Sequence, residues 1–202
     1  MSLSEASMEA YKKYNKRKNF ISKNGGNTPR KMCIVGKSNL DLNDSIFKDF
    51  YSDKKHIEML SEIARENIHE INFENEKYVI NVLKEKGDTH GWHLDDYTYA
   101  LVLVNRSPHI NNGGSLEYVS HVNFDGASKL DVESLENILR NSVVNSVYIP
   151  NNNIYLMKTN TTLHRVSPLQ TLDFRMSTTL SYATKQDLLL VENHKSIVDL
   201  YE

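Results

Sequence analysis

The segment His93-Leu-Asp-Asp-Tyr-Thr-Tyr-Ala-Leu-Val-Leu-Val104 joins a strong strand signal to two side chains that can bind a metal. Residues 97–104 are rich in β-branched and aromatic side chains, which favour a strand. His93 and Asp95 lie two positions apart, so on an extended backbone both side chains leave the same face and can converge on one ion. The segment therefore predicts a β-rich fold with a candidate pair of metal ligands just before a strand.

A third candidate ligand, His164, lies in a second strand-like stretch, residues 153–166, far along the chain. It can reach His93 and Asp95 only by tertiary folding, as when a sheet curls back on itself. Two histidines and one carboxylate on one face of an octahedral metal leave three positions open, and this donor set suits a non-heme Fe(II) oxygenase. The three residues therefore predict a mononuclear iron site with an open face for chemistry.

Arg175 and Ser177 extend the pattern toward a co-substrate. Arg175 lies eleven residues after His164, beyond the turn-prone Ser167-Pro168, so the two belong to consecutive strands that can pair antiparallel. A guanidinium there can hold the far carboxylate of a dicarboxylic co-substrate in a bidentate grip. Ser177 lies on the same strand face and adds a hydroxyl. The pair predicts an anchor for that co-substrate.

The alternative is that a His-x-Asp match arises by chance. His56 and Glu58 form a similar match, but they lie in residues 52–68, whose apolar positions follow a helical period. Residues two apart on a helix diverge by roughly 200°, so this pair is discarded as a metal site. His93 and Asp95 alone would fit a polar loop equally well. The distal histidine and the Arg-x-Ser pair, in a β-rich context, favour the iron site.

The order His-x-Asp, distal His, then Arg-x-Ser after ten intervening residues resembles the signature of the Fe(II)/2-oxoglutarate-dependent oxygenases. From about Glu76 to Tyr182 the chain is also similar to a small clade of free amino acid halogenases and lysine hydroxylases. That similarity is carried by His90-Gly-Trp-His-Leu-Asp-Asp-Tyr97, Ala100-Leu-Val-Leu-Val104 and Gly113-Gly-Ser-Leu-Glu-Tyr-Val119. The resemblance implies Fe(II) as cofactor, 2-oxoglutarate as co-substrate, and O2. In the halogenating relatives a glycine replaces the carboxylate ligand so that chloride can bind the iron. Because this chain keeps Asp95, the resemblance implies hydroxylation of an unactivated carbon.

The same resemblance implies a set of substrate contacts. His90, Asp96 and Glu76 resemble the relatives' contacts to a cationic side chain, and Arg30 matches a residue that grips the substrate carboxylate. The resemblance thus favours free L-lysine or a similar basic amino acid. Each residue also has a purely structural reading. The two carboxylates can be exposed or salt-bridged, His90 can orient a metal ligand, and Arg30 can belong to a solvated loop.

Four further side chains are weaker candidates for the substrate pocket. Glu117 shares the strand alternation of Ser115 and Val119, and Trp92, the only tryptophan, lies between two site histidines. The tryptophan fits a core anchor as well as a substrate wall. Thr179 and Ser181 follow Ser177 on one strand face, where they either line the pocket or fill the interior of the fold.

The expected fold class is mainly β with supporting helices, a double-stranded β-helix or jelly roll of two facing antiparallel sheets. Turn residues at Pro108, 111–114 and 150–153 separate short strands. The expected strands are 31–35, 73–83, 97–104, 115–121, 147–149, 154–158, 164–166 and 174–183. The expected helices are 44–50, 52–68, which backs the sheet, and 131–141. The resemblance places the metal ligands at one open end of the roll.

The polar residues 1–30 predict an N-terminal helix followed by a flexible connection, with its basic run on a solvated face. Residues 31–202 are expected to form the double-stranded β-helix oxygenase domain with its helical support, so that the chain is a single domain overall. The tail, residues 185–202, is expected to cover the mouth of the roll as a lid or a helix.

Composition narrows the function classes. With 202 residues the chain can bury a core and enclose a ligand cavity. A net charge of −2 with intermixed signs argues against a nucleic-acid partner. A single cysteine, Cys33, excludes an intramolecular disulfide framework, and no stretch fits a signal peptide or a membrane span. We therefore expect a cytoplasmic enzyme with a small-molecule substrate, and the sequence leaves its oligomeric state open.

Two rival functions share parts of this pattern. A metal-binding jelly-roll protein that isomerises or senses a ligand needs the metal triad but no carboxylate anchor, so Arg175 and Ser177 argue against it. A peptide or protein hydroxylase shares the whole core but is expected to have a broad open groove. This chain has few long insertions between its expected strands.

Overall fold

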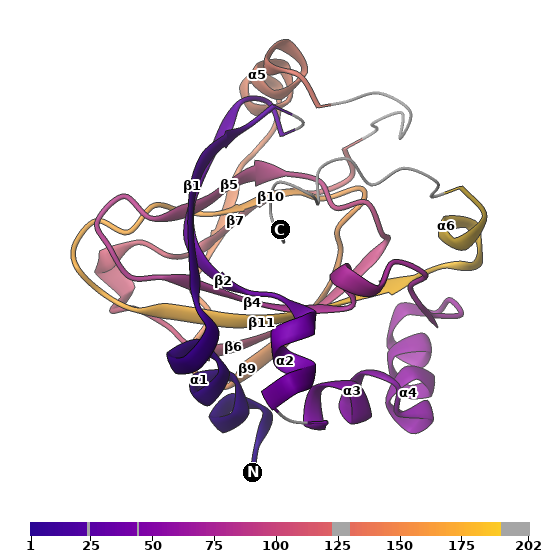
Figure 1. Cartoon of the computed structure of the whole chain (residues 1–202). Coiled ribbons are helices and arrows are strands. Elements are labelled where there is room, and N and C mark those ends of the chain that lie inside the picture. Colours follow the sequence, from indigo (N-terminus) through magenta and orange to yellow (C-terminus); the bar gives the residue numbers. More distant parts are fainter. Residues whose placement is uncertain (24, 44, 123–129, 191–202) are drawn as a thin grey trace.

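The computed structural model describes residues 1–23, 25–43, 45–122 and 130–190. In this part of the chain eleven strands form one curled sheet (Figure 1). They are β1 (Lys16–Ser22), β2 (Thr28–Val35), β3 (His69–Glu70), β4 (Tyr78–Leu83), β5 (Thr89–His93), β6 (Tyr99–Arg106), β7 (Leu116–Val119), β8 (Asn145–Val147), β9 (Asn153–Lys158), β10 (Leu163–Val166) and β11 (Arg175–Ala183). The helices of the same part are α1 (Leu3–Tyr14), α2 (Lys37–Asn43), α3 (Ile46–Tyr51), α4 (Lys54–Ala64), α5 (Val132–Asn141), α6 (Lys185–Leu190) and the 3₁₀ turns η1 (Glu74–Glu76) and η2 (Ile110–Asn112).

The strand order is β8-β7-β10-β5-β2-β4-β11-β6-β9, with β1 paired to β2 and β3 paired to β11. Strands β8, β7, β10 and β5 form one wall of a roll, and β4, β11, β6 and β9 form the facing wall. Strand β2 pairs with both β5 and β4 and so joins the two walls. The named strand pairs are antiparallel. The double-stranded β-helix predicted from the sequence is confirmed.

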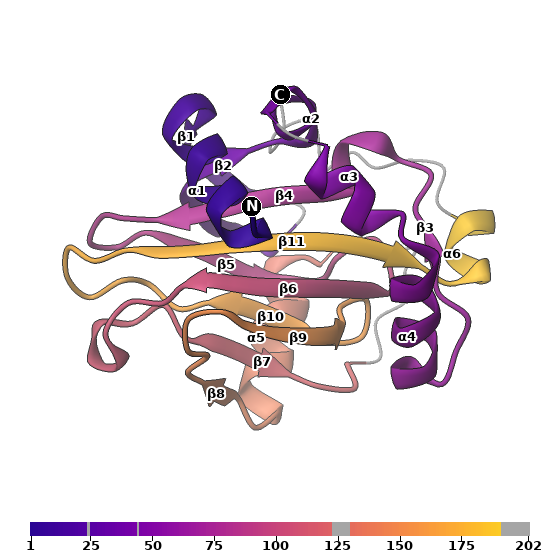
Figure 2. The same ribbon diagram turned by 90° about the horizontal axis from the view of Figure 1, so that it is seen from below.

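Alternation along the strands separates an outer apolar face from an inner face that carries the polar site residues and a smaller apolar cluster, which includes Val79 and Leu83. On β11, Leu180 and Tyr182 point outward into the main core, whereas Ser177 and Thr179 point inward. Helices α1 to α4 cover this outer face (Figure 2). The Tyr51 ring of α3 stacks on Tyr182 with ring centroids 4.8 Å apart. Each large apolar side chain buried there contributes about 1.5–3 kcal/mol of transfer free energy.

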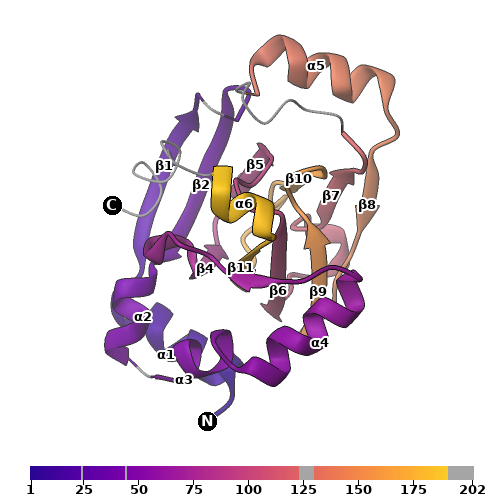
Figure 3. The same cartoon turned by 90° about the vertical axis from the view of Figure 1, so that its right-hand side faces the viewer.

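The outer face of the other wall has its own core beneath α5 (Figure 3). Asp131 caps this helix by accepting a hydrogen bond from the backbone N–H of Ser134 at 2.8 Å. Leu135 of the helix packs on Leu163 of β10 and on Trp92 of β5. The two walls are therefore braced from outside, and the polar residues of the site share the inner faces with the apolar cluster around Val79 and Leu83.

The structure differs from the expectation at several elements. Residues 16–22 are strand β1 rather than part of a helix with a flexible connection, and they pair with β2 along seven residue pairs. Four polar residues open this strand and its apolar residues Phe20 and Ile21 are adjacent, so it lacks the alternation that marks a half-buried strand. Strands β3 and β5 and helix α2 were not predicted, and the expected strand 73–83 begins with η1.

The expected helices 44–50, 52–68 and 131–141 are present as α3, α4 and α5. The tail begins with the predicted helical turn α6, while the rest of the tail, from residue 191, lies outside the described residues. None of the described helices has the length and apolar composition to cross a membrane.

Candidate metal centre

The three predicted metal ligands meet at one end of the roll. His93 ends β5 and lies directly opposite His164 of β10, and Asp95 follows in the loop before β6. One donor atom from each residue lies within 4.8 Å of the others. Asp95 Oδ1 lies 3.4 Å from His93 Nε2, and Asp95 Oδ2 lies 3.9 Å from His164 Nε2. The three donors therefore face a common point.

Both imidazoles are oriented for metal binding by their second nitrogen. His93 Nδ1 lies 2.7 Å from the carbonyl oxygen of Gly91, and His164 Nδ1 lies 2.9 Å from that of Thr162. A carbonyl only accepts, so Nδ1 carries the proton and Nε2 presents a lone pair. Burial lowers the pKa of His93 well below its usual value, which keeps the ring neutral. Neutral imidazole is the form that ligates metals.

Asp95 supplies the carboxylate of the donor set. Burial raises the pKa of Asp95, and the neighbouring negative charge of Asp96 adds to the effect. A divalent cation between the three donors would reverse this shift, because it favours the charged carboxylate. Two histidines and one carboxylate aimed at one point fit Fe(II) with three positions left open.

Arg175 lies on the inner face of β11 and is 3 % exposed. Its Nη1 donates to Ser177 Oγ at 3.0 Å, and it also hydrogen-bonds the Tyr155 hydroxyl of β9. Burial lowers the pKa of the guanidinium. A buried cation is costly unless an anion approaches it, so this position is suited to a ligand carboxylate.

Tyr155 and Asn81 belong to the same inner wall but were missed in the sequence. Asn81 of β4 lies directly opposite Ser177, and its buried Oδ1 makes no hydrogen bond. An asparagine inside the otherwise apolar run Tyr78–Leu83 was a usable signal. Tyr155 carries no such signal, since a tyrosine in a strand fits any half-buried surface.

His90 and Arg30 adjoin the metal ligands through strand pairing. The His90 ring stacks on His93 with centroids 4.1 Å apart, and Arg30 of β2 lies directly opposite His90. Arg30 is 3 % exposed and donates to Thr28 Oγ1 at 3.0 Å, so it is not part of a solvated loop. Gly91 permits this approach, because a Cβ there would lie 2.7 Å from the carbonyl oxygen of Pro29.

Glu76 and Asp96 bring two further carboxyl groups close to Asp95. Glu76 lies in η1 and is buried, whereas Asp96 in the ligand loop is exposed. Burial, reinforced by the charges of Asp96 and Asp95, raises the pKa of Glu76 to about 9. Three carboxylates so arranged favour the approach of a cation.

Thr179, Ser181 and Tyr118 complete the inner surface. Thr179 and Ser181 are only half-buried, whereas their neighbours Leu180 and Tyr182, which point outward, are buried. The interior of the roll is therefore not completely filled by side chains at this position. Tyr118 of β7 lies directly opposite His164, on the same face of the sheet. It was not among the predicted candidates.

Two weaker candidates lie on the wrong face. Glu117 accepts a hydrogen bond from Arg165 Nε at 2.5 Å on the outer side of the sheet, and the Arg165 guanidinium lies 4.8 Å from the Trp92 ring centroid. Trp92 packs in the core under α5. Neither lines the pocket, because a one-residue step along a strand turns a side chain to the opposite face.

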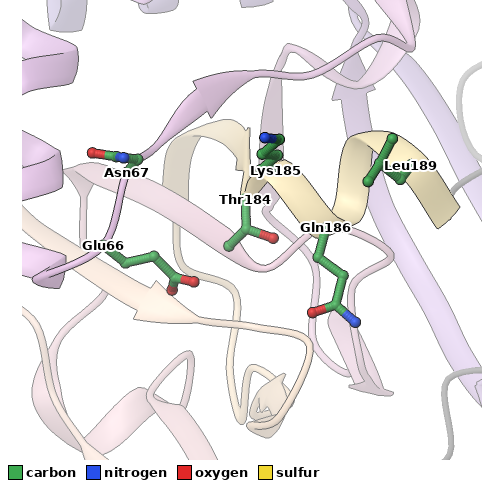
Figure 4. Close-up of a pocket in the computed structure, with 6 residues that line it drawn as sticks. All are labelled: Glu66, Asn67, Thr184, Lys185, Gln186 and Leu189. Carbon is green, nitrogen blue, oxygen red and sulfur yellow. The ribbon is translucent and has the colours of Figure 1, made fainter.

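A surface hollow of about 520 Å³ lies away from this centre, beside α6 (Figure 4). It contains none of the predicted site residues, and it is lined by Glu66, Asn67, Thr184, Lys185, Gln186 and Leu189. Its walls offer no convergent metal donors, so the histidine–aspartate cluster remains the candidate for chemistry.

A double-stranded β-helix with two histidines and an aspartate at one end defines a mononuclear non-heme iron protein. The chain matches the family model of halogenase D over residues 2–202 and belongs to that family. No curated protein matches the chain.

Solved structures with the same fold are 2-oxoglutarate-dependent enzymes. The carbocyclase SnoK from nogalamycin biosynthesis superposes with a TM-score of 0.65 at 13% identity, covering 96% of this chain and 84% of that one. The epimerase SnoN from the same biosynthesis gives 0.64 at 12% identity, with 91% and 75% covered. A 2OG-Fe(II) oxygenase family oxidoreductase from Burkholderia pseudomallei gives 0.58 at 13% identity, with 87% and 76% covered. At these identities the likeness supports the fold. With the family match, it places the chain in the 2-oxoglutarate/Fe(II) oxygenase superfamily.

Proposed function

We propose that the protein is an Fe(II)/2-oxoglutarate-dependent hydroxylase of a free basic amino acid such as L-lysine. The observation that carries the proposal is the convergence of His93, Asp95 and His164 beside the buried Arg175. The three ligands hold Fe(II), and 2-oxoglutarate and O2 are the reactants. When bound, the metal and co-substrate supply the oxidising chemistry, while the protein orients the substrate and excludes water.

The inner wall around Arg175 is the proposed co-substrate anchor. Its guanidinium takes the remote carboxylate of 2-oxoglutarate, and Ser177 and Tyr155 hold the guanidinium by hydrogen bonds. The Asn81 amide lies opposite Ser177, within the same polar patch. A carboxylate bound at this point offsets the desolvation cost of the Arg175 guanidinium and accepts its hydrogen bonds.

Asp95 favours hydroxylation over halogenation, although the family model is named after a halogenase. Its carboxylate occupies the third ligand position, 3.4 Å from one histidine Nε2 and 3.9 Å from the other. A halide needs that position, and a carboxylate held there also repels an anion.

Charge in the pocket supports a substrate with a cationic side chain. Glu76 and Asp96 offer carboxyl groups on one side of the ligand loop, and a bound ammonium favours the ionised form of Glu76. Arg30 offers positive charge beside His90. A free amino acid with a terminal ammonium carries the complementary pair, a carboxylate for Arg30 and an ammonium for Glu76. We also propose a cytoplasmic location, where ferrous iron is easier to keep reduced.

The test is to load the protein anaerobically with Fe(II) and 2-oxoglutarate, add oxygen, and measure succinate against a panel of free amino acids. Lysine and its uncharged isostere norleucine form the matched pair. We expect lysine to stimulate succinate formation and to gain one oxygen by mass spectrometry. Equal turnover of norleucine would refute the cationic pocket, and failure of every amino acid to stimulate succinate would refute the substrate class.

A further inference from the structure

The loop that carries Asp95 is held by side chains from distant parts of the chain. Residues 94–98 connect β5 to β6 and have no regular structure of their own, and residues 95–98 are the part that carries the bonds described below. Asp187 of α6, a buried residue, accepts hydrogen bonds from the Thr98 backbone N–H at 3.2 Å and from the Thr98 hydroxyl at 2.9 Å. The C-terminal helix is thereby joined to the ligand loop.

A second set of bonds joins this loop to the segment before His164. The fully buried Thr159 donates its N–H to the Thr98 carbonyl at 2.8 Å and its hydroxyl to the Tyr97 carbonyl at 3.0 Å. Its own carbonyl accepts from the Asp95 N–H at 3.4 Å. Asn160 donates to the Thr98 hydroxyl at 2.9 Å, so that hydroxyl connects both sets of bonds.

Helix capping explains only half of the contacts of Asp187. Its Oδ2 accepts from the Thr184 N–H at 2.7 Å, and its own N–H donates to Thr184 Oγ1 at 3.2 Å. These two bonds are the reciprocal pattern of a capping box and would suffice for α6. The two bonds to Thr98 leave the helix and contribute nothing to its cap.

We propose that Asp187 is a positioning residue of the iron site, which fixes the 95–98 loop so that the Asp95 carboxylate meets the two histidines. The inference rests on the iron site of the proposed function but not on its substrate. Asp95 needs such support, because its side chain is 32% exposed, against 12% for His93 and 9% for His164. Outer-shell partners of metal ligands typically contribute about 10–100-fold to metal affinity.

The experiment measures Co(II) affinity by d–d absorption in the full chain, without co-substrate, substrate or oxygen. Two variants remove the contact from opposite sides, Asp187→Ala and the near-isosteric Thr98→Val. We expect each to weaken Co(II) binding about 10-fold or more. At saturating Fe(II), the KM for 2-oxoglutarate should stay within about twofold, because Arg175 is untouched.

The matched control is Ser61→Ala. Ser61 Oγ accepts from the Ile68 N–H at 3.0 Å, so its loss removes a similar end-of-helix bond that does not touch the ligand loop. We expect this variant to lose thermal stability but keep its Co(II) affinity. If Asp187→Ala and Thr98→Val lose stability to the same extent as Ser61→Ala and bind Co(II) normally, Asp187 is only a cap and the proposal is wrong.

Folding failure and failure of the iron site are separately visible. If Asp187→Ala does not fold, Thr98→Val decides the matter, since it keeps the cap and removes the two bonds of the Thr98 hydroxyl, to Asp187 and from Asn160. Asn160→Ala, which removes only the second of these bonds, is then its control and should keep the Co(II) affinity. If the wild-type protein itself binds no Co(II), the metal centre is refuted before any variant is compared. If the wild type binds Co(II) but oxidises no amino acid, the substrate assignment fails and the role of Asp187 stands.

Discussion

The histidine ligands and the aspartate ligand of the metal centre are held by different kinds of structure. His93 and His164 lie opposite each other on paired strands, and their Nδ1 atoms bond to carbonyls of their own strand or the turn before it. Asp95 lies in a loop that is held by side chains from α6 and from the turn before β10. Strand pairing thus positions two ligands, whereas the third depends on side chains and on two backbone hydrogen bonds to Thr159.

This difference predicts which ligand can change without loss of the fold. Replacing a strand residue leaves the ladder of backbone hydrogen bonds in place but empties a rigidly defined position. A loop ligand can be replaced at lower structural cost, because little else packs on it. The resemblance noted in the sequence agrees, since the halogenating relatives differ from this chain at the aspartate and keep both histidines.

The largest effect is expected from removing a histidine. His93→Ala or His164→Ala should abolish Fe(II)-dependent succinate formation and weaken metal binding by more than the ~100-fold of outer-shell changes. Metal content after dialysis and succinate formation provide the measurements. The exposed His109→Ala is the control and should retain the metal. Undiminished turnover in either ligand variant would remove that histidine from the site.

Asp95→Gly should keep the fold and lose most activity, with little or no chlorinated product in chloride buffer. The change opens a coordination position and removes one negative charge, but a halide also needs donors that replace its hydration. Mass spectrometry of the wild-type and variant reactions decides between outcomes. A chlorinated product from the wild type would contradict Asp95 as a ligand. Efficient chlorination by the variant would show that those donors are already present.

Arg175→Ala should raise the KM for 2-oxoglutarate about 30-fold, because a hydrogen bond to a charged group contributes about 2 kcal/mol. Metal affinity should not change, because the ligands are intact. Tyr155→Phe tests the newly recognised neighbour and should raise KM only about fivefold, or about 1 kcal/mol. Steady-state kinetics in 2-oxoglutarate at saturating Fe(II) give both values. Unchanged KM in Arg175→Ala would place the anchor elsewhere.

The mildest perturbation, which changes no residue, is a change of pH, and substrate binding should depend on it. Glu76, with its pKa raised to about 9, is protonated at neutral pH, and a bound ammonium favours its charged form. The affinity for lysine should therefore rise with pH, by up to about tenfold per unit, and level off above about 9. Norleucine is the control for titration of the substrate's own backbone groups. Calorimetry should show proton release with lysine that disappears in Glu76→Gln; equal release in that variant would exclude Glu76.

The fold could be predicted where side chains alternate or repeat, and not elsewhere. Residues 97–104 carry a dense strand signal and form β6, offset by two residues. Strand β1 is polar except for the adjacent Phe20 and Ile21, and β5 combines two histidines with a glycine, so neither shows a hydrophobic period. Their extended form comes from pairing with β2 and β10, which is a tertiary effect.

Spacing along the chain predicted some of the site residues. The contacts between residues on different strands could not be predicted from the sequence. The interval from His164 to Arg175 matches two consecutive strands, so both could be placed from the sequence. Tyr155 reaches Arg175 only through the order of β11, β6 and β9, which no local pattern contains. Glu117 was assigned to the wrong face for the same reason. The sequence shows that it shares a strand face with Ser115 and Val119, but it does not show whether that face points into the roll or outward.

The close approach at Gly91 also determines which substitutions the chain tolerates. A Cβ at this position would meet the Pro29 carbonyl oxygen at 2.7 Å and Thr28 Cβ at 2.8 Å, whereas one at Gly36 would meet nothing within 4 Å. In a library randomised at both glycines and selected for folded protein, position 36 should accept many residues. Position 91 should return glycine alone, so under purifying selection it would change more slowly than surface positions that never touch the metal.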